Sequence, residues 1–458
     1  MTAVQGPVHL IGIGGIHMSA IAQLLMEQSV KVSGSDLRPS NLTAKLEALG
    51  ATISYGHATE NLPEDAALVV YTAAAADDNA ELVEARRREL PIVIRAEMVA
   101  RLMEGKRVVA VAGAHGKTTT SSLIAHILVQ AGREPMYLLG GESIDLGGHA
   151  SWGHGDICVV EADEYKRAFH EYAPDFAVIT NVEPDHLDYY GSEEAYREAF
   201  VEFGKKVKEG GVILACADDP GARWVSDVLG DDPLQHETYG IEGVRYWMAR
   251  TIQLSGDGAT FEVTRGGAPV GTLHSNYIVA EHFVRNALAA TAVCLHLDVP
   301  FETIASAVSS FQGARRRFER IGEAEGILVM DDYAHHPTEV RATIAAAIRA
   351  FPERRIIGIH QPHTYSRISY LWEEWLNCWT GLEALVILET YAARETPLPG
   401  RSAADLAAAI HGVPTIYAAD FDEAARKALE LALPGDVVFT IGAGDVVEVG
   451  PKILELLQ

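Results

Sequence analysis

The sequence predicts an α/β protein with three segments, each built around a mostly parallel β-sheet covered by helices. Short runs of β-branched and aliphatic residues alternate with amphipathic helical runs along the whole chain. A glycine turn follows such a run at Gly12 and again at Gly113. The 458 residues exceed what one hydrophobic core normally holds, and about three domains are the natural expectation. We place them at residues 1–104, 105–314 and 315–458.

Composition and charge exclude several functional classes. The chain has 63 acidic and 37 basic residues, a formal charge of -26, which would repel the phosphate backbone of nucleic acids. No apolar run approaches the ~20 residues that span a bilayer, and the first ten residues, MTAVQGPVHL, carry no basic leader. The four cysteines form no C-x-x-C pair, which argues against a zinc site or a disulfide framework. We therefore expect a cytoplasmic protein that binds neither nucleic acid nor membrane, and the sequence indicates no oligomeric state.

The first segment begins as a mononucleotide-binding βαβ unit, so we expect it to be Rossmann-like. VHLIGIGG reads as a strand and turn, GIHMSAIAQLLMEQ as a helix and KVSGSD as a second strand; ATISYGH, ALVVYTAA and IVIRAEM read as further strands. Ligands of open α/β sheets bind beyond the carboxyl ends of the strands. The candidate contacts to a nucleotide-like ligand are Gly12, Gly14, Gly15, Ser35, Asp36, His57 and Thr72. For His57 and Thr72, a purely structural loop hydrogen bond is the alternative.

The turn differs from a dinucleotide-binding fingerprint at His17. The pattern G-x-G-x-x-G needs a third glycine where this chain has His17, and the imidazole would obstruct the close helix-to-strand packing of that fingerprint. An NAD-dependent enzyme therefore remains only as an alternative.

A phosphate loop opens the second segment at residues 108–120, VVAVAGAHGKTTT. A strand-like run leads through glycines into the helical run SSLIAHILVQAG, the context that a phosphate-binding turn requires. Lysine supplies charge to the terminal phosphates and the next hydroxyl can ligate Mg²⁺. The spacing G-x-x-G-K-T is shorter than the full pattern, so an ordinary strand-to-helix turn is the alternative. The candidate ATP contacts are Gly113, Ala114, His115, Gly116, Lys117, Thr118 and Thr119.

Two acidic clusters follow buried-type strands of the same segment. DICVV runs into EADE and FAVIT runs into NVEPDHLD, and both clusters should share a sheet edge with the phosphate loop. Mg²⁺ takes oxygen ligands, so Thr118 and Glu161 are the candidates for one ion and His186 for a second. Helix caps and a hydrogen-bonded loop histidine are the alternatives.

The remaining elements complete the central sheet and begin another. A helix follows from Glu193 and then the strand GVILAC, while residues 236–275 read as a small antiparallel addition. Helical pattern returns at 281–295 and after Pro300. ILVM, RIIGIH, ALVILE and DVVFTIGAGD, paired with helical runs or loops such as QPHTYSR and TYAARETP, predict a second doubly wound, Rossmann-like sheet.

Together these motifs resemble the Mur ligase family across essentially the whole chain. The motifs that carry the resemblance are GIGGIHMSAIA, VSGSD, GAHGKTTT, EADEY, TNVEPDHLDYY, RRF, DDYAHHPTE, HQPHTYSR, ETYAARETP and GAGD. The resemblance implies an ADP-forming amide ligase in which ATP phosphorylates the lactyl carboxylate of UDP-N-acetylmuramate and L-alanine attacks the acyl phosphate. UDP-N-acetylmuramate and L-alanine would be the substrates, with ATP and two Mg²⁺ ions.

The resemblance also implies roles for residues. Lys117 and Glu161 would handle the triphosphate with Thr118, His186 would hold the second Mg²⁺, and these residues form the expected catalytic set. Further ATP contacts would be Asn181, His282, Asn286, Arg316, Arg317 and Asp332. The amino-acid pocket would contain Tyr333, His335 and Arg367, and the Gly12 to Gly15 turn would bind the UDP group.

The sequence departs from the family pattern at two places. In AEHFVRNA, Ala280 and Phe283 replace the usual glycine and asparagine. In EADEYKRAF, Tyr165, Lys166 and Arg167 replace a frequent Ser-Asp-Gly. EADEY also resembles family members that recycle a tripeptide onto the same sugar nucleotide, whereas HHPTE and QPHTYSR fit addition of alanine better. A nucleotide-binding switch without ligase activity is the alternative from another class.

Overall fold

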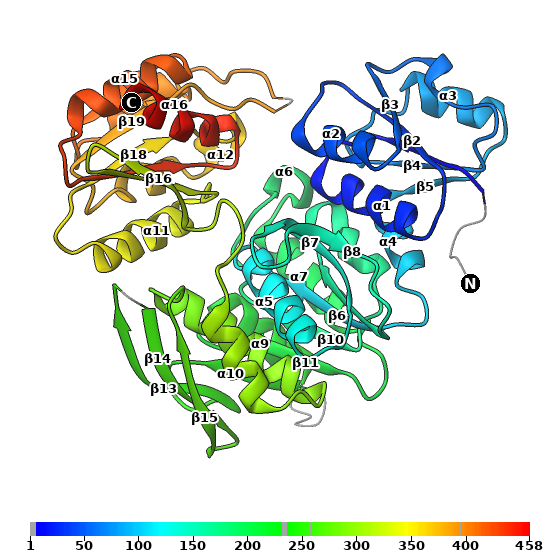
Figure 1. The fold of residues 1–458 in the computed structure, drawn as a ribbon, viewed down its shortest axis with the longest axis horizontal. Coiled ribbons are helices and arrows are strands. Elements are labelled where there is room, and N and C mark those ends of the chain that lie inside the picture. The colour runs from blue at the N-terminus through cyan, green and yellow to red at the C-terminus, as the bar shows by residue number, and fades with distance from the viewer. Residues whose placement is uncertain (1–5, 231–235, 257, 394) are drawn as a thin grey trace. The chain divides into compact units, whose positions relative to one another are not determined.

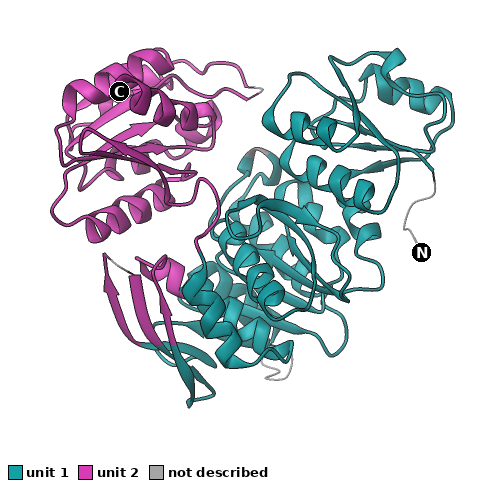
Figure 2. Ribbon diagram, in the orientation of Figure 1, with its two compact units in different colours: residues 1–250, 262–272, 285–311 teal, residues 251–261, 273–284, 312–458 magenta. Residues whose placement is uncertain are grey.

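The computed structural model describes residues 6–230, 236–256, 258–393 and 395–458. The first five residues, where we expect no leader, lie outside this part of the chain. Three sheets and their covering helices appear in it, which confirms the α/β fold class (Figure 1). The chain divides into two compact units, each described by itself below (Figure 2). Unit 1 comprises residues 1–250, 262–272 and 285–311, and unit 2 comprises residues 251–261, 273–284 and 312–458.

The first sheet lies in unit 1 and is fully parallel, in the order β3-β2-β1-β4-β5. Its strands are β1 (Val8–Ile11), β2 (Val32–Asp36), β3 (Thr52–Tyr55), β4 (Leu68–Tyr71) and β5 (Ile92–Ile94). Its helices are α1 (Ile16–Glu27), α2 (Asn41–Ala48), α3 (Ala80–Arg87) and α4 (Arg95–Leu102). The order reverses at β1, so the Gly12 turn lies at a topological switch point. The predicted run IVIRAEM is strand only to Ile94, because α4 starts at the next residue.

The central sheet has ten strands in the order β15-β14-β13-β12-β11-β10-β6-β9-β7-β8. Those in its middle are β6 (Arg107–Ala112), β9 (Ile157–Glu161), β10 (Phe176–Ile179) and β11 (Val212–Cys216), all buried and parallel. Its helices are α5 (Lys117–Gln130), α6 (Leu187–Tyr190), α7 (Glu193–Gly204), α8 (Pro220–Leu229), α9 (Glu281–His296) and α10 (Phe301–Ser310). The ends of β6, β9 and β10 therefore meet at one edge, as predicted for the phosphate loop and the two acidic clusters.

Both margins of the central sheet differ from the simple prediction. The antiparallel hairpin β7 (Met136–Ser143) and β8 (Gly148–Ser151) was not expected, because GGES and GHAS lack apolar alternation. On the other side, β12 (His236–Gly240) pairs parallel with both β11 and β13 (Trp247–Ser255). On this side of the sheet, the antiparallel part begins with β14 (Gly258–Arg265) and β15 (Ala268–Ser275). Each of these strands is separated from the strand before it by two residues, and so short a connection requires antiparallel pairing.

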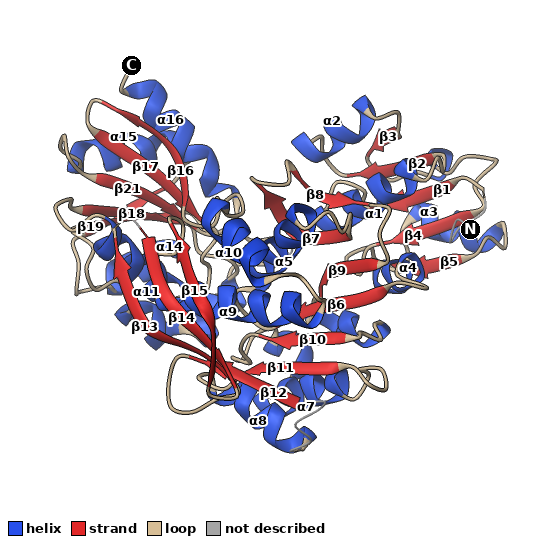
Figure 3. Ribbon diagram, turned by 60° about the horizontal axis from the view of Figure 1, so that its bottom comes forward, coloured by secondary structure: helices blue, strands red, loops and turns tan. Residues whose placement is uncertain are grey.

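The third sheet lies in unit 2, in the order β16-β17-β21-β18-β19-β20 (Figure 3). Its strands are β16 (Glu319–Ala324), β17 (Ile327–Asp332), β18 (Ile356–His360), β19 (Ala384–Leu388), β20 (Thr415–Ala418) and β21 (Val437–Ile441). Only β16 is antiparallel. One apolar cluster contains residues of α11 (Pro337–Ala350), α13 (Trp372–Asn377) and α14 (Ala403–Ala409), and the other contains residues of α15 (Phe421–Leu431) and α16 (Val449–Leu456). The sheet is doubly wound, although TYAARETP forms no helix in its described residues.

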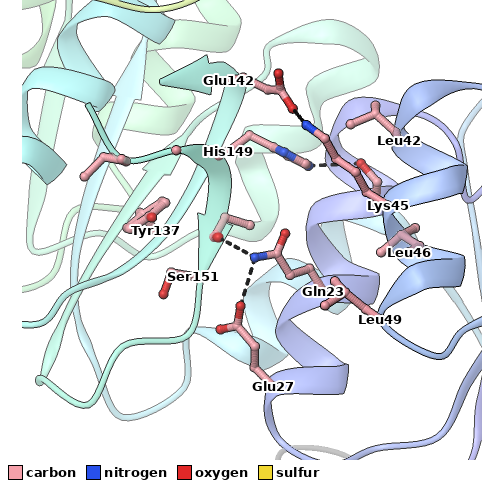
Figure 4. Close-up of a pocket in the computed structure, with 15 residues that line it drawn as sticks. Gln23, Glu27, Leu42, Lys45, Leu46, Leu49, Tyr137, Glu142, His149 and Ser151 are labelled. Atoms are coloured by element: carbon pink, nitrogen blue, oxygen red, sulfur yellow. Dashed lines mark hydrogen bonds and ion pairs between the residues drawn. The ribbon is translucent and has the colours of Figure 1, made fainter. Parts of the chain in front are cut away.

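In unit 1, helices of the first sheet pack against the β7–β8 hairpin of the central sheet. Ser19 Oγ bonds His149 Nε2 at 3.0 Å, and Gln23 Nε2 donates to the Ala150 carbonyl at 2.8 Å (Figure 4). Lys45 pairs with Glu142, and both residues line a pocket of about 240 Å³. These bonds fix α1 against the central sheet. No described helix combines the length and hydropathy needed to cross a bilayer.

Candidate active site

The glycine turn after β1 presents the N-terminus of α1. Gly12 N and Ile13 N donate to the Ser35 carbonyl at 2.8 and 3.0 Å, and Gly14 N donates to Asp36 Oδ2 at 2.8 Å. A Cβ on Gly12 would lie 2.6 Å from Thr72 Cγ2, so only glycine fits here. No side chain caps α1, whose first-turn N–H groups are suited to an anion. The predicted residues of this turn are thus brought together.

A buried carboxylate, Glu81, organises the polar side chains beside that turn. Its Oε2 accepts from His9 at 2.8 Å and from Ser35 at 2.7 Å, and its Oε1 lies 3.1 Å from both His57 Nδ1 and Asn61 Nδ2. Burial alone would raise the pKa of Glu81, but these hydrogen bonds outweigh it and lower the pKa to about 2. Glu81 therefore stays ionised and holds His57, a predicted ligand contact, in place.

The phosphate loop after β6 is braced by its own unit. Gly113 has φ 141° and a Cβ there would meet Thr180, while Gly116 has φ 80° and caps α5, so both positions need glycine. Asn181 accepts from His115 N at 2.8 Å and donates to the His115 carbonyl at 2.9 Å. The Asn286 amide packs over Gly116, where a Cβ would lie 2.9 Å from its Oδ1. Asn181 and Asn286, predicted to contact ATP, thus lie at the loop.

Lys117, the first residue of α5, bonds the loop and a carboxylate. Its Nζ donates to the Gly113 and Ala114 carbonyls and to Glu164 Oε2 at 3.0 Å. Burial disfavours the ammonium, but Glu164, Glu161 and Asp163 outweigh it and raise the pKa of Lys117. His186 Nε2 lies 3.8 Å from Glu164 Oε1. Glu164 therefore joins two of the predicted catalytic residues, Lys117 and His186.

The third predicted catalytic residue, Glu161, faces Thr118. Thr118 Oγ1 donates to Glu161 Oε2 at 2.8 Å, and Gly140 N donates to the same oxygen at 3.0 Å. Adjacent ligands of an octahedral Mg²⁺ ion lie about 2.9 Å apart, given Mg–O distances near 2.0–2.1 Å. The two oxygens fit neighbouring positions around such an ion. A Cβ on Gly140 would lie 2.3 Å from both Glu161 oxygens, so a side chain here would displace this carboxylate.

The loop after β9 contains the departure from the family pattern. Lys166 and Arg167 adopt left-handed φ values of 51° and 57°, within the stretch where the family often has Ser-Asp-Gly. A left-handed conformation costs roughly 1–2 kcal/mol for a residue with a Cβ. Arg167 pairs with Glu202, and Lys166 Nζ donates to the Ala73 carbonyl at 2.8 Å, so both side chains are anchored.

In unit 2, the predicted ATP residues of the third sheet surround the end of β17. Asp332 accepts from Phe318 N and Ala334 N at 2.8 and 2.9 Å. Arg316 Nε contacts Asp331 at 3.2 Å and its Nη2 donates to the Gly442 and Gly444 carbonyls. These bonds tie Arg316 into the sheet. Arg316 therefore has a structural role in this unit.

Two further residues were predicted to contact ATP, and one of them, Arg317, lies beside Tyr333 of the predicted amino-acid pocket. Arg317 Nη1 lies 3.6 Å from Glu339, and its guanidinium lies 5.1 Å from the ring centre of Tyr333. His282, also predicted to contact ATP, lies in α9 one turn before Asn286, and its ring is 4.1 Å from that of Phe283.

Aromatic and basic side chains gather at the ends of β17 and β18. The rings of Tyr333 and His335 lie 5.4 Å apart, and His335 lies 6.0 Å from His363. Arg367 Nη1 donates to the His363 carbonyl at 2.6 Å, and His363 stacks on Tyr391 at 5.2 Å. The predicted residues Tyr333, His335 and Arg367 thus share one cluster with His363 and Tyr391, which were not predicted.

The structure adds residues that local patterns did not single out. Glu81 occupies the first turn of α3, where an acid is usually a surface helix cap, and Gly140 lies in an unpredicted strand. Glu164 was visible in the EADE run, but nothing local distinguished it from Glu161 or Asp163. For Glu164, the signal that could have found it is its position after β9, whose end shares a sheet edge with the phosphate loop.

These features define a P-loop nucleotide-binding protein of the α/β class, with a parallel-dominated central sheet and two doubly wound sheets. Family comparison narrows that class. Models described as Mur ligase family, catalytic domain, as Mur ligase middle domain, and as Mur ligase, glutamate ligase domain match residues 7–107, 111–294 and 316–444. The chain belongs to the Mur ligase family, as its motifs indicated.

Individual relatives cover the whole chain. It is 42% identical to UDP-N-acetylmuramate--L-alanine ligase of Anaeromyxobacter dehalogenans (strain 2CP-1), over 99% of this chain and 98% of that protein. The ligase of the same name from Geobacter sulfurreducens is 41% identical, over 98% and 97%. Among solved structures, UDP-N-acetylmuramate-alanine ligase from Thermotoga maritima has a TM-score of 0.84 at 28% identity, over 99% of both chains. A murein peptide ligase from Psychrobacter arcticus shares the fold, with a TM-score of 0.72 at 24% identity over 99% of both chains.

Proposed function

We infer that this chain is an ATP-dependent ligase that joins L-alanine to the lactyl carboxylate of UDP-N-acetylmuramate and releases ADP and phosphate. The observation that carries the inference is full-length similarity, at 41–42% identity, to proteins named UDP-N-acetylmuramate--L-alanine ligase. The phosphate loop, the acidic edge beside it and the basic and aromatic cluster of unit 2 support the same reaction. We expect it to take place in the cytoplasm, where ATP is available.

The chemistry follows from charge and position. Lys117 would neutralise the terminal phosphates while the loop N–H groups orient them. The lactyl carboxylate would then attack the γ-phosphorus, the bond from that phosphorus to the bridging oxygen would break, and ADP would leave as the acyl phosphate forms. The neutral amine of L-alanine then attacks the acyl carbon, phosphate leaves, and the nitrogen loses a proton. Phosphoryl transfer of this kind needs no protein nucleophile.

Metal binding belongs to the same proposal. Thr118 and Glu161 would hold one Mg²⁺, and His186 with Glu164 would hold a second, because these groups lie at the loop edge. Bound Mg²⁺ would supply positive charge to the phosphate oxygens. Glu161 and Glu164 hold Thr118 and Lys117 in position at that edge.

The third-sheet cluster is the proposed site for the amino acid. A guanidinium such as that of Arg367 pairs with a carboxylate in two parallel hydrogen bonds. Tyr333 and His335 would line the same pocket. Asp332 and Arg317 are the proposed contacts to ATP from this unit, since Arg316 already bonds three groups of the sheet.

Substrate omission tests the function directly. Phosphate release is measured with ATP, UDP-N-acetylmuramate and each amine donor in turn. The proposal expects release only when UDP-N-acetylmuramate and L-alanine are both present. Release with an L-alanyl-glutamyl-diaminopimelate tripeptide but not with L-alanine would assign the chain to recycling, and nucleotide binding without release would contradict ligase activity.

A further inference from the structure

The motif ETYAARETP, residues 389–397, carries part of the family resemblance but has no role in the reaction as proposed above. It follows β19 and runs beside the loop after β18. Tyr391 N donates to the Pro362 carbonyl at 2.9 Å, and the Tyr391 ring stacks on His363 with an interplanar angle of 7°. The motif therefore lies against the loop that leads into α12 (Tyr365–Tyr370), the helix that contains Arg367.

Glu395, the seventh residue of this motif, caps the start of α12. Its Oε2 accepts from Ser366 N at 2.7 Å, and its Oε1 accepts from Thr364 Oγ1 at 2.8 Å and from Ser366 Oγ. Within the described residues, the side chain of Thr364, which directly precedes α12, makes no capping bond to the helix. The carboxylate thus satisfies an N–H that the first turn of a helix leaves without a partner inside the helix. Glu395 therefore fixes the backbone directly before Arg367.

The Glu395 carboxylate is ionised at neutral pH. Burial would raise its pKa, but the hydrogen bonds from Ser366 and Thr364, together with the charge of Arg367, outweigh burial and lower the pKa. Hydrogen bonds to an ionised group are stronger than bonds between neutral groups. One half-buried carboxylate with three such bonds therefore gives this turn a defined position.

The guanidinium of Arg367 is anchored to the same loop. Its Nη1 donates to the His363 carbonyl at 2.6 Å and lies 3.0 Å from His363 Nδ1. His363 is in turn stacked on Tyr391 of the motif. A guanidinium has five N–H donors, so it can keep its bond to the loop and also pair with a carboxylate. Residues 391 and 395 of the motif thus support the two ends of Arg367, its guanidinium and its backbone.

We propose that Glu395 is a positioning residue for L-alanine, because its cap on α12 holds Arg367 where the guanidinium pairs with the alanine carboxylate. The proposal rests on the function inferred above. The alanine carboxylate takes no part in bond formation, so its contact with Arg367 is equally strong in the ground state and in the transition state. Loss of the cap should therefore raise KM for L-alanine and leave kcat nearly unchanged.

Steady-state kinetics of purified full-length variants test this role. Glu395→Ala removes all three bonds and should raise KM for L-alanine about tenfold, while kcat and the KM values for ATP and UDP-N-acetylmuramate stay within about twofold of the wild type. Glu395→Gln, whose amide oxygen can still accept from Ser366 N, should stay within about threefold for every parameter.

Asp405→Ala is the matched control in the same unit. Asp405 accepts a backbone N–H and a hydroxyl from Ser402, at 2.9 and 2.6 Å, so it makes the same kinds of bond at the start of another helix, α14. This variant should leave KM for L-alanine unchanged.

Arg367 gives a second readout through a double-mutant cycle. In Arg367→Ala the guanidinium that Glu395 positions is absent, so the further change Glu395→Ala should alter kcat/KM for L-alanine by less than about twofold. A role in stability alone would lower kcat/KM by the same factor in both backgrounds.

Other results would overturn the proposal. A wild-type KM for L-alanine in Glu395→Ala, or equal losses for all three substrates, would show that Glu395 only stabilises the loop. Glu395→Asp serves where Glu395→Ala fails to fold, because its carboxylate is one methylene too short to reach both Thr364 and Ser366, and it should raise the same KM. Absence of L-alanine-dependent turnover in the wild type would contradict the proposed function and this role together. An active wild type with an unchanged Glu395→Ala variant would contradict only the role of Glu395.

Discussion

At the scale of single residues, the pairing of Lys117 with Glu164 positions the ammonium group that we propose binds the phosphates of ATP. We expect Lys117→Ala to reduce turnover by at least about 10²–10³-fold, the usual cost of losing one stabilising group at a site of developing charge. UDP-N-acetylmuramate binding should persist, because its proposed site lies on the first sheet. Steady-state phosphate release and calorimetric titration measure the two effects. Parallel loss of both, in a variant that remains folded, would contradict the separation of the sites.

Gly140 gives a second prediction from one added methyl group. In Gly140→Ala the Cβ would meet both Glu161 oxygens at 2.3 Å and displace the carboxylate from Thr118. We expect a several-fold higher Mg²⁺ concentration for half-maximal turnover, measured by Mg²⁺ titration of phosphate release. Gly148→Ala on the same hairpin adds a methyl where no heavy atom lies within 4 Å and is the matched control. An unchanged Mg²⁺ requirement in Gly140→Ala would remove Glu161 from the proposed metal site.

Residues whose function follows from local pattern could be predicted from the sequence, and residues that act across the fold could not. The strand, glycine turn and lysine of the phosphate loop are contiguous, so Gly116, Lys117 and Thr118 were identifiable. Glu164 meets Lys117 across 47 positions, and Glu81 meets His9 across 72. Neither pairing leaves a periodic signal, because it depends on which strands become neighbours.

At the scale of elements, Glu81 joins β1, β2 and the loops after β3 to α3. Its folded pKa of about 2 lies below the ordinary value of 4.5, so its stabilisation is complete above pH 4.5 and is lost as the pH falls toward 2. We expect Glu81→Gln to lower stability at pH 7 by roughly 2 kcal/mol, allowing for solvent screening through the partly exposed His57. The difference from the wild type should shrink below about pH 4.

Urea unfolding from pH 3 to pH 7 measures this dependence. Glu84→Gln, one turn along α3, removes an exposed ion pair with Arg87 and should change stability little at any pH. A constant difference between Glu81→Gln and the wild type over this range would mean that the carboxylate is not ionised in the folded protein.

Element prediction succeeded where periodicity was strong and failed at the margins of the sheets. The buried strands β6, β9, β10 and β11 were recognisable as continuous apolar runs. The β7–β8 hairpin, β16 and β20 were missed, because sheet margins carry glycine and polar residues and derive their order from neighbouring strands. The parallel pairing of β12 was missed for the same reason, since direction depends on a crossover that includes α8.

At the scale of the whole molecule, two compact units with separate apolar cores predict more than one unfolding transition. UDP should raise only the transition of unit 1, by an amount equivalent to about 2.7 kcal/mol at a hundredfold excess over its Kd. Differential scanning calorimetry with and without UDP measures this. Glu81→Gln should lower the temperature of the same transition, and this shift would assign that transition to unit 1. A single transition that UDP moves as a whole would show that the units unfold together.

The internal contact between Lys117 and Glu164 also bears on how the catalytic cycle ends. An anion that binds to the Lys117 ammonium must compete with the Glu164 carboxylate. The loop would therefore bind a nucleotide triphosphate, which makes several contacts, in preference to a simple anion. The orthophosphate left after amide formation is no longer joined to a nucleotide, so it lacks the additional contacts that the nucleotide makes. Glu164 would then pair again with Lys117, and this competition would speed the release of phosphate.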